Sequence, residues 1–291
     1  MITRGIESSA KGMMSLIDYQ DVVAHNLANV NTTAFKKTHI TFRDLMQVEV
    51  ETKKIPLTSN PKDTQFERVG QLSLGCATNR TYIDFSQGGL IETGNKLDLA
   101  LQGEGFFKMR YSHVPENAPY DEKNYYYTRC GTLKLTDNHY LVNKEGDYIM
   151  DTQNRRIRVV FDPQNETEEP NNRIDAFRDL VINEQGVLQV TAPGNSRTLQ
   201  QIQIVDFRDK TKVSTIGEGK FLQIEGMDAQ MYTKTEGFAI QQGMLEASNT
   251  NVINEMINNI NVSRSYETLA KMIKTQGDTV SKAIDLGVVK G

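Results

Sequence analysis

The sequence predicts an α+β protein in which terminal amphipathic helices bracket a central, mainly antiparallel β domain. Apolar residues recur at helical spacing near both ends of the chain, from Ile6 to Leu27 and from Val252 to Ile284. Between these segments the apolar period changes to two, and turn-forming residues separate short runs. The 7 prolines all lie from Pro56 to Pro193, so neither end contains the residue that most strongly disrupts a helix.

Length and charge set the first limits on function. The chain has 291 residues, which predicts roughly two domains of about 150 residues each. The net charge is −4 and there is no basic block, which argues against a nucleic-acid-binding protein. Mean hydropathy is −0.50, and no apolar run approaches the roughly 20 residues of a membrane-spanning helix. The first residues also lack the apolar core and cleavage site of a secretory signal peptide.

The N-terminal helix is predicted from one apolar stripe with gaps of three, four or seven residues. This helix should end within Asn29–Thr33, because Asn and Thr side chains compete for backbone hydrogen bonds. The stripe consists of Ile6, Ala10, Met13, Ile17, Ala24 and Leu27.

The C-terminal helix is predicted from a stripe with a mean step close to 3.6 over about 33 residues, or roughly 50 Å. Ser248–Asn251 offer several N-caps, and Glu255 lies in the first turn, where the helix dipole favours an anion. Such a long stripe needs a long partner, so we expect the two terminal helices to form an antiparallel, coiled-coil-like assembly domain. The stripe consists of Val252, Met256, Ile260, Tyr266, Ala270, Ile273, Val280 and Ile284.

Six asparagines gather near the start of the C-terminal helix, although asparagine has a poor helix propensity. Two interpretations have equal weight. The amides cap the helix and cover a solvated face, or they form hydrogen bonds across a helix–helix interface and fix its register. The cluster is Asn249, Asn251, Asn254, Asn258, Asn259 and Asn261.

The middle of the chain is predicted to be β-rich because many short runs are separated by close turn signals such as Gly88-Gly89 and Glu145-Gly146-Asp147. Two stretches resemble loops: Glu49–Gly70, a polar connector, and Asp162–Arg173, an exposed excursion. The predicted divisions are an N-terminal assembly helix (1–34), an extended or β connector (35–92), a β-rich outer domain (93–240) and a C-terminal assembly helix (241–291).

Reactive side chains form no recognisable site, so we predict no catalytic, cofactor-binding or metal-binding residues and no enzyme. Gly103-Glu104-Gly105 lacks the further residues of a phosphate loop and is read as a tight turn. Cys76 and Cys130 lack metal-ligand spacing and are interpreted as small packed hydrophobes, with a disulfide between them as the open alternative. The histidines also lack ligand spacing; they are His25, His39, His113 and His139.

Four blocks, in order along the chain, resemble the bacterial flagellar axial proteins of the rod and hook. The segment His25–Lys37 resembles an N-L-A-N core followed by T-x-G-F/Y-K, and Thr93–Phe107 resembles T-G-N-x-L-D-x-A-I-x-G-x-G-F-F. Tyr127–Gly131 is similar to Y-T-R-x-G, and Gln242–Asn249 to Q-G-x-L-E-x-S-N. The signature residues carried over are Asn26, Leu27, Ala28, Asn29, Thr33, Phe35, Lys36, Leu245, Glu246, Ser248, Asn249, Arg264, Tyr266 and Glu267.

The chain departs from the family pattern at several positions. Ala34 stands where the family has Gly; if that position requires a positive φ, alanine costs about 1 kcal/mol there. The segments 49–70 and 109–124 match nothing in the pattern. The length suits a rod protein better than a hook protein. Phe42–Met46 resembles the distal-rod type and the tail Gly277–Gly291 the proximal-rod type, which is slightly favoured.

The resemblance implies a structural subunit of the flagellar basal-body rod that polymerises through its terminal helices. The polymer would be the axial drive shaft that transmits torque and forms the export channel. The implied partners are further copies, other rod and hook axial proteins, and the flagellar type III export apparatus, with no nucleic acid and no membrane insertion. The implied location is the periplasmic rod, reached without a cleaved signal peptide.

We expect the two apolar stripes to form the assembly interface, and two alternatives to a rod subunit stay open. One is a hook-type subunit, and the other is a secreted β-domain binding module whose helices form a dimer clamp. The expected interface residues are Ile6, Ala10, Met13, Ile17, Leu27, Val252, Met256, Ile260, Tyr266, Ala270, Ile273 and Val280.

Overall fold

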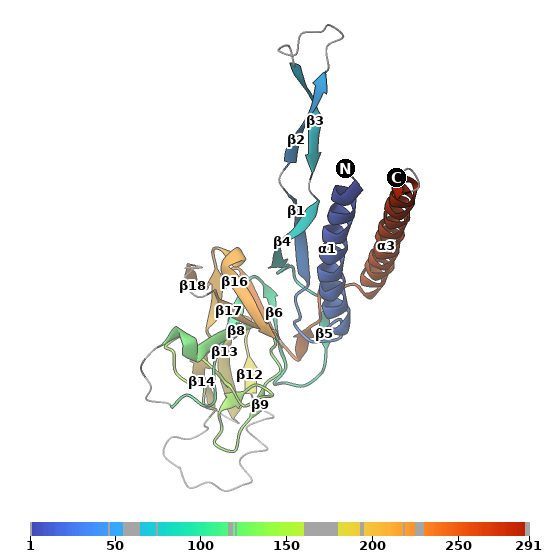
Figure 1. The fold of residues 1–291 in the computed structure, drawn as a ribbon. Coiled ribbons are helices and arrows are strands. Elements are labelled where there is room, and N and C mark those ends of the chain that lie inside the picture. Colours follow the sequence, from blue (N-terminus) through green and yellow to red (C-terminus); the bar gives the residue numbers. More distant parts are fainter. Residues whose placement is uncertain are drawn as a thin grey trace. The chain divides into compact units, whose positions relative to one another are not determined.

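A computed structural model describes residues 2–45, 47–54, 65–73, 75–115, 119, 121–159, 180–192, 195–217, 219–224 and 230–288 (Figure 1). The chain forms two compact units, and both are built from discontinuous segments. The helical unit contains Met1–Ala28, Thr38–Tyr82 and Asn251–Gly291. The β unit contains Asn29–Lys37 and Ile83–Thr250. The fourfold division drawn from the sequence stays a prediction about assembly roles.

The helical unit is built on two helices, α1 (Ile2–Ala28) and α3 (Val252–Val288). Both helices were predicted, and α1 ends directly before the Asn- and Thr-rich stretch. The two helices pack together and run antiparallel, because Gly5, Ser9 and Gly12 of α1 lie beside Gln276, Met272 and Leu269 of α3 respectively. The α+β architecture with paired terminal helices is therefore confirmed.

Small residues of α1 lie against α3. Ser9 Oγ donates to Met272 Sδ at 3.4 Å. A Cβ added to Gly12 would lie 3.3 Å from Leu269 Cδ1, and one on Gly5 would lie 2.9 Å from the Gln276 side chain. Small side chains allow two helix backbones to approach closely, so this face of α1 is suited to a helical neighbour.

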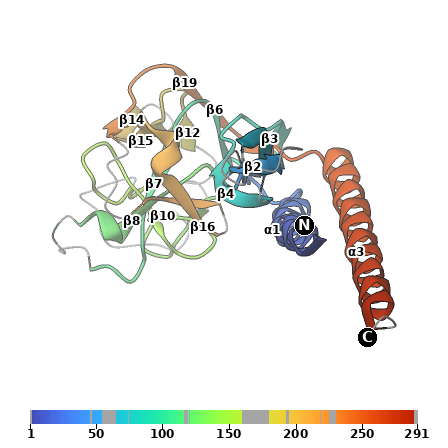
Figure 2. The ribbon, with the colours of Figure 1, turned by 45° about the horizontal axis from the view of Figure 1, so that its top comes forward.

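Helix α1 also packs against strand β1 and forms hydrogen bonds with strand β4; Figure 2 shows α1 nearly end-on beside β4. Strand β1 (Thr38–Asp44) pairs with β4 (Cys76–Ile83). Ser15 Oγ donates to the carbonyl oxygen of Cys76 at 3.3 Å, and Thr78 Oγ1 donates to Asp18 at 2.5 Å. These contacts fix the helix against the strand pair.

The stretch Glu49–Gly70, interpreted from sequence as a loop-like connector, contains most of an antiparallel strand pair. Strand β2 (Gln47–Lys54) pairs with β3 (Gln65–Ser73) over nearly their whole length. That interpretation was wrong because a two-stranded ribbon is held by backbone hydrogen bonds, and these require no run of apolar residues. Residues 160–179 lie outside the described part of the chain and include the other predicted loop, Asp162–Arg173.

The β unit is antiparallel throughout its paired strands, as predicted. Its largest sheet has nine strands in the order β16-β17-β8-β7-β11-β10-β9, with β15 pairing to β7 and β18. Smaller sheets are β12-β13-β14, β19-β6 and β20-β5. The strands are β5 Leu90–Glu92, β6 Leu99–Gly103, β7 Phe106–Arg110, β8 Tyr125–Thr128, β9 Lys134–Leu135, β10 Leu141–Val142, β11 Tyr148–Ile149, β12 Leu180–Ile182, β13 Val187–Ala192, β14 Asn195–Gln201, β15 Ile204–Phe207, β16 Val213–Gly217, β17 Lys220–Gln223, β18 Met231–Thr233, β19 Phe238–Gln242 and β20 Met244–Glu246.

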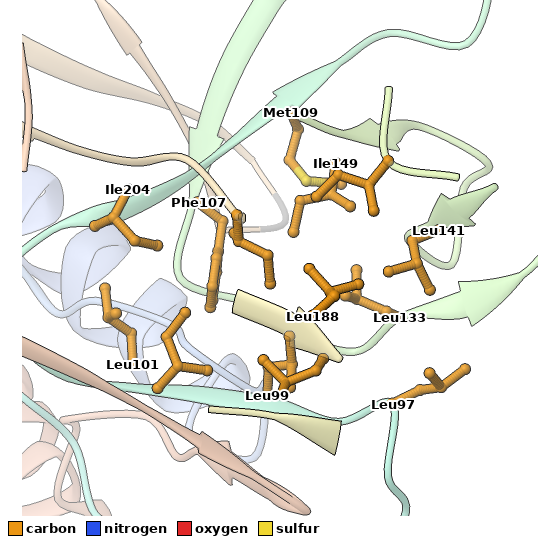
Figure 3. Packing of buried hydrophobic residues seen from close by; sticks show 14 of the residues in the cluster. Leu97, Leu99, Leu101, Phe107, Met109, Leu133, Leu141, Ile149, Leu188 and Ile204 are labelled. Atoms are coloured by element: carbon orange, nitrogen blue, oxygen red, sulfur yellow. The ribbon is translucent and has the colours of Figure 1, made fainter. Parts of the chain in front are cut away.

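The β unit has its own hydrophobic core in two clusters. The larger one is mainly aliphatic and gathers side chains from β6, β7, β10, β11, β12, β13 and β15 (Figure 3). The smaller one is rich in aromatic rings and is centred on Phe106, Phe207 and Phe221. The described residues of the β unit also include two short 3-10 helices, Glu122–Asn124 and Lys210–Lys212. In the described part of the chain, no helix has both the length and the apolar character to span a membrane.

Candidate functional site

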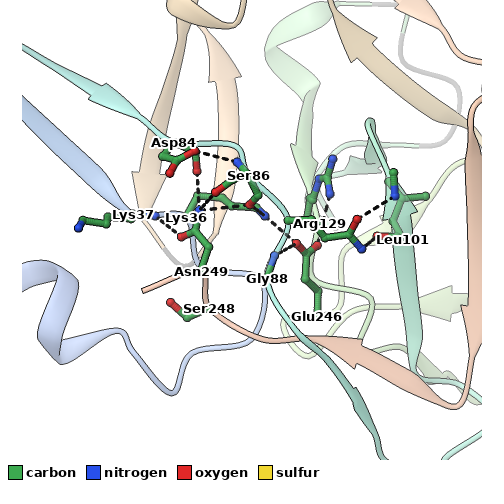
Figure 4. Close-up of polar contacts among 12 residues, drawn as sticks. Lys36, Lys37, Asp84, Ser86, Gly88, Leu101, Arg129, Glu246, Ser248 and Asn249 are labelled. Atoms are coloured by element: carbon green, nitrogen blue, oxygen red, sulfur yellow. Dashed lines mark hydrogen bonds and ion pairs between the residues drawn. The ribbon is translucent and has the colours of Figure 1, made fainter. Parts of the chain in front are cut away.

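The segment that follows α1 meets the segment that precedes α3 inside the β unit. Ala34 N donates to the carbonyl oxygen of Glu246 at 2.8 Å, and Asn249 N donates to that of Phe35 at 3.4 Å. Two regions of the family signature, far apart in sequence, are thus joined by backbone hydrogen bonds. We call the side chains that complete this junction, Lys36, Arg129, Glu246 and Asn249, the terminal clasp (Figure 4).

Lys36 and Glu246 form the centre of the terminal clasp. Lys36 Nζ lies 2.6 Å from Glu246 Oε1, and both side chains are 0% exposed. The same ammonium donates to the carbonyl oxygen of Ser86 at 2.6 Å. Glu246 Oε1 also accepts a hydrogen bond from Gly88 N at 2.9 Å. Three chain segments therefore meet at one buried ion pair.

Arg129 supplies a second cation to the same carboxylate. Its Nη1 atom lies 3.5 Å from Glu246 Oε2, and its guanidinium stands over the Phe106 ring, 5.4 Å from the centroid. Burial lowers the pKa of Lys36 below its ordinary value of 10.5, and the attraction of Glu246 opposes that shift. Glu246 is thus the anion between two buried cations, so its loss would leave both cations uncompensated.

Asn249 joins two segments through both ends of its amide. Its Oδ1 atom accepts from Lys37 N at 2.7 Å, while Nδ2 donates to the carbonyl oxygen of Asp84 at 2.8 Å and to Ser86 Oγ at 3.0 Å. A carboxylate offers no donor for this arrangement, which explains the choice of asparagine. Asn251 has a different role: it caps α3 by accepting from Ile253 N and Asn254 N.

Backbone geometry at the junction depends on small residues. Ala34 has a φ of 59°, so the family position usually held by glycine requires the left-handed conformation here too. This alanine therefore carries the strain of about 1 kcal/mol expected from the sequence. At Gly88 there is no room for a side chain, because an added Cβ would lie 2.0 Å from the carbonyl oxygen of Ala247.

Comparison with known proteins finds sequence matches both at the clasp and along nearly the whole chain. Residues 241–286 match the family model described as "Flagellar basal body rod FlgEFG protein C-terminal", which covers Glu246 and Asn249 of the terminal clasp. The flagellar basal-body rod protein FlgG of Borreliella burgdorferi is 29% identical over 288 residues, covering 97% of this chain and 98% of that protein. The chain belongs to the flagellar basal-body rod protein family.

Further rod proteins match along almost their whole length. FlgG of Bacillus subtilis is 24% identical over 97% of this chain and 98% of its own length. FlgF of Caulobacter vibrioides is 28% identical over 94% of this chain and 93% of its own length. The chain is therefore a rod subunit, and rod proteins of this family are structural and not enzymes.

The remaining signature residues of the rod subunit fall into two groups. Near the clasp, Thr33 Oγ1 lies 3.4 Å from Cys130 Sγ, Ser248 Oγ accepts from Thr250 N, and Leu245 pairs with Ile91 across β20 and β5. The other group lies in the helical unit, at the end of α1 and within α3. There, Asn26 binds both backbone groups of Thr38 at 2.8 and 2.9 Å, Leu27 is half-buried, and Ala28, Arg264, Tyr266 and Glu267 are exposed.

The expected assembly residues are incompletely covered in the single subunit. None of the 12 is fully buried, and their burial divides them into two sets. The half-buried set consists of Ile6, Met13, Leu27, Val252, Ala270, Ile273 and Val280. The exposed set consists of Ala10, Ile17, Met256, Ile260 and Tyr266.

Sequence reasoning missed two structural features of the rod subunit. One is the small-residue face of α1. Its residues Gly5, Ser9 and Gly12 recur at gaps of four and three, and this spacing could have predicted a close helix contact. The other is the buried charge of Lys36, Glu246 and Arg129, which no local pattern reveals because Lys36 and Glu246 are 210 positions apart.

Reactive side chains are dispersed in the described part of the rod subunit, and there no group of three His, Cys, Asp or Glu side chains is placed to hold a metal ion. His39 stacks on Tyr82 with 5.2 Å between ring centroids, and His139 occupies a turn with a φ of 61°. Gly103 and Gly105 have φ values of 95° and 129°, in keeping with a tight turn. Cys76 and Cys130 are free thiols.

Proposed function

We propose that this rod subunit polymerises through α1 and α3 into the axial drive shaft, which transmits torque and surrounds the export channel. The observation that supports this proposal is the apolar surface on the first turns of α3. Ile253, Met256, Ile257 and Ile260 are 68%, 51%, 50% and 52% exposed. At about 25 cal/mol per Å² of apolar area, covering these side chains with neighbouring copies would favour assembly.

The expected partners of the polymer are further copies and other rod and hook axial proteins, in the periplasmic rod. Export through the flagellar type III apparatus belongs to the same proposal. The tail Gly277–Gly291 favours the proximal-rod type, with the distal-rod type as the alternative. A hook-type subunit is a second alternative, and detection of the chain in isolated hooks would support it.

Charge substitutions on the two helices test the proposal. Ile260→Asp and Met13→Asp should abolish incorporation into purified hook–basal bodies, because a buried carboxylate would then lie within each apolar contact. Near-UV circular dichroism of each purified variant should retain the signal of the β unit. Asn261→Asp and Gln20→Asp change exposed polar residues of the same helices and should be incorporated normally.

Normal motility with either Ile260→Asp or Met13→Asp would contradict the proposal. A discrete dimer that never polymerises, detected by sedimentation of the purified chain, would instead support the binding-module alternative. Immunoblots of intact hook–basal bodies give the decisive localisation.

A further inference from the structure

Several buried polar atoms at the terminal clasp have no hydrogen-bond partner in the described part of the chain. The atoms are Nη1 and Nε of Arg129 and Oε2 of Glu246. Both residues are buried, with exposed fractions of 2% and 1%. Because buried polar side chains are almost always hydrogen-bonded, these atoms require a partner that the neighbouring residues do not supply.

Arg129 lies close to Glu246 without a direct hydrogen bond. The distance from Nη1 to Oε2 is 3.5 Å, longer than the roughly 2.8 Å of a charge-assisted N–H···O bond. The guanidinium also stands over the Phe106 ring, 5.4 Å from its centroid, which holds it in this position. The ion pair therefore leaves an N–H donor and a carboxylate acceptor side by side, each able to form a further bond.

The polar groups around the ion pair already have partners. Glu246 Oε1 accepts from Lys36 Nζ at 2.6 Å and from Gly88 N at 2.9 Å. The hydroxyl of Thr128, at the end of β8, donates to the carbonyl oxygen of Gly219 at 2.9 Å. Turning any of these donors toward Oε2 would break an existing hydrogen bond.

We propose that an ordered water molecule binds at the terminal clasp, accepting from Arg129 Nη1 and donating to Glu246 Oε2. Two atoms 3.5 Å apart can both lie about 2.8 Å from one water oxygen, with the three atoms forming a triangle. The ligand must both accept and donate a hydrogen bond, which water does. A halide has no proton to donate to the carboxylate, and a metal cation accepts no hydrogen bond from the guanidinium.

This water joins two distant segments of the β unit. Arg129 lies between β8 and β9, whereas Glu246 is the last residue of β20. The water completes the hydrogen bonding of the carboxylate, since protein groups bond to Oε1 and the water bonds to Oε2. Closing the terminal clasp therefore traps a solvent molecule instead of expelling all solvent from the junction.

A crystal structure of the full chain, at a resolution that shows ordered waters, tests the site directly. We expect electron density for a water about 2.8 Å from both Arg129 Nη1 and Glu246 Oε2. A direct hydrogen bond between those two atoms, or no density beside them, would contradict the proposal. Crystals grown in bromide provide the control, since an anomalous peak at the same point would identify a halide and overturn the assignment to water.

Oxygen-17 magnetic relaxation dispersion gives an independent test in solution, because it counts long-lived buried waters. Arg129→Met keeps an unbranched side chain beside Phe106 but has no N–H group, so this variant should hold one long-lived water fewer than the native chain. Arg208→Met removes the same group from an exposed position and should leave the number unchanged. Equal numbers in the native chain and in Arg129→Met, with folding checked by near-UV circular dichroism, would overturn the proposal. If Arg129→Met does not fold, the crystal structure decides.

Discussion

Glu246 shows how one side chain determines whether a buried junction can form. Glu246→Gln keeps an acceptor for Gly88 N but removes the charge that balances Lys36 and Arg129. We expect the free energy of unfolding of the β unit to fall by roughly 3 kcal/mol. Urea unfolding followed by near-UV circular dichroism of the tyrosines measures this change. Glu236→Gln, at an exposed position, is the control and should be nearly neutral.

The Glu246→Gln loss should also depend on pH. Without the carboxylate, the attraction that raises the pKa of Lys36 disappears, so the buried ammonium loses its proton more readily. The deficit should therefore shrink as the pH rises. A deficit that stays constant between neutral and alkaline pH would argue against buried charge as the cause.

Lys108 provides a separate pH-dependent effect. Burial lowers the pKa of Lys108 from 10.5 to about 8, although its Nζ donates to Asn154. Below pH 8 the lysine is charged in both folded and unfolded chains, so the full desolvation cost is present. Between about pH 8 and 10.5 the folded chain has released this proton while the unfolded chain retains it, so stability rises by up to about 3 kcal/mol.

Replacement by methionine isolates this contribution from other titrating groups. Lys108→Met should be more stable than the native chain at pH 7, and the difference should disappear by pH 10.5. Lys134→Met, at an exposed strand position, should follow the native curve at all pH values. Parallel pH profiles for the native chain and Lys108→Met would exclude this account.

Single residues differed in how well the sequence predicted them. The left-handed conformation of Ala34 followed from one substitution in a family pattern, because only a few residue types tolerate a positive φ. Neither interpretation of the asparagine cluster, capping of a solvated helix or hydrogen bonding across a helix–helix interface, described the role of Asn249. Its hydrogen-bond partners lie more than 160 positions away in sequence, so no local rule could find them.

At the scale of elements, α1 has two different faces. Its small residues contact α3, whereas Ile17 and Met14 are 44% and 67% exposed. Helical spacing predicted the helix because a 3.6-residue period is a property of sequence alone. It did not identify which face contacts α3, since close helix packing selects small residues as well as apolar ones.

A bulky residue in the small face should disrupt this helix pair. Gly12→Leu would place a branched side chain where an added Cβ already lies 3.3 Å from Leu269. We expect α3 to exchange its amide hydrogens faster, because the helices can no longer approach closely. Ala10→Leu, on the exposed face, is the matched control. Unchanged hydrogen exchange in α3 of Gly12→Leu would contradict this packing.

The β strands show the same limit on prediction. Short alternating runs separated by turns indicated the antiparallel β unit, because its strands need an apolar side toward the core. The pairing of β2 with β3 was not predicted within the extended or β connector, because backbone hydrogen bonds between two strands leave no pattern of their own in the sequence. Alternation of apolar and polar residues is readable in a sequence, whereas the pairing of one backbone with another is not.

At the scale of the whole molecule, two discontinuous units are interleaved along one chain. The positions of the prolines predicted helical ends and a β middle, but not that Thr38–Tyr82 belongs with the helices. Membership of a unit depends on which segments meet in space. That information comes from long-range contacts, which a single sequence does not display.

The β unit should fold without the helices. Its two core clusters and its terminal clasp all lie within residues 29–250. A fragment of residues 29–250, with residues 38–82 replaced by a short Gly-Ser linker, should unfold cooperatively. A second fragment beginning at residue 83 and ending at residue 243 lacks both arms of the clasp and should be less stable. Equal urea midpoints for the two fragments would show that the clasp contributes nothing.

The separation of Lys36 from Glu246 also sets an order of events in time. The β unit cannot close its junction until a residue 210 positions further along the chain has arrived. Non-local contacts of this kind slow folding because the intervening loop must be ordered first. A chain that emerges N-terminus first thus keeps its first arm open until nearly all of it has passed. Completion of the β unit therefore requires that the chain is present at least as far as Glu246.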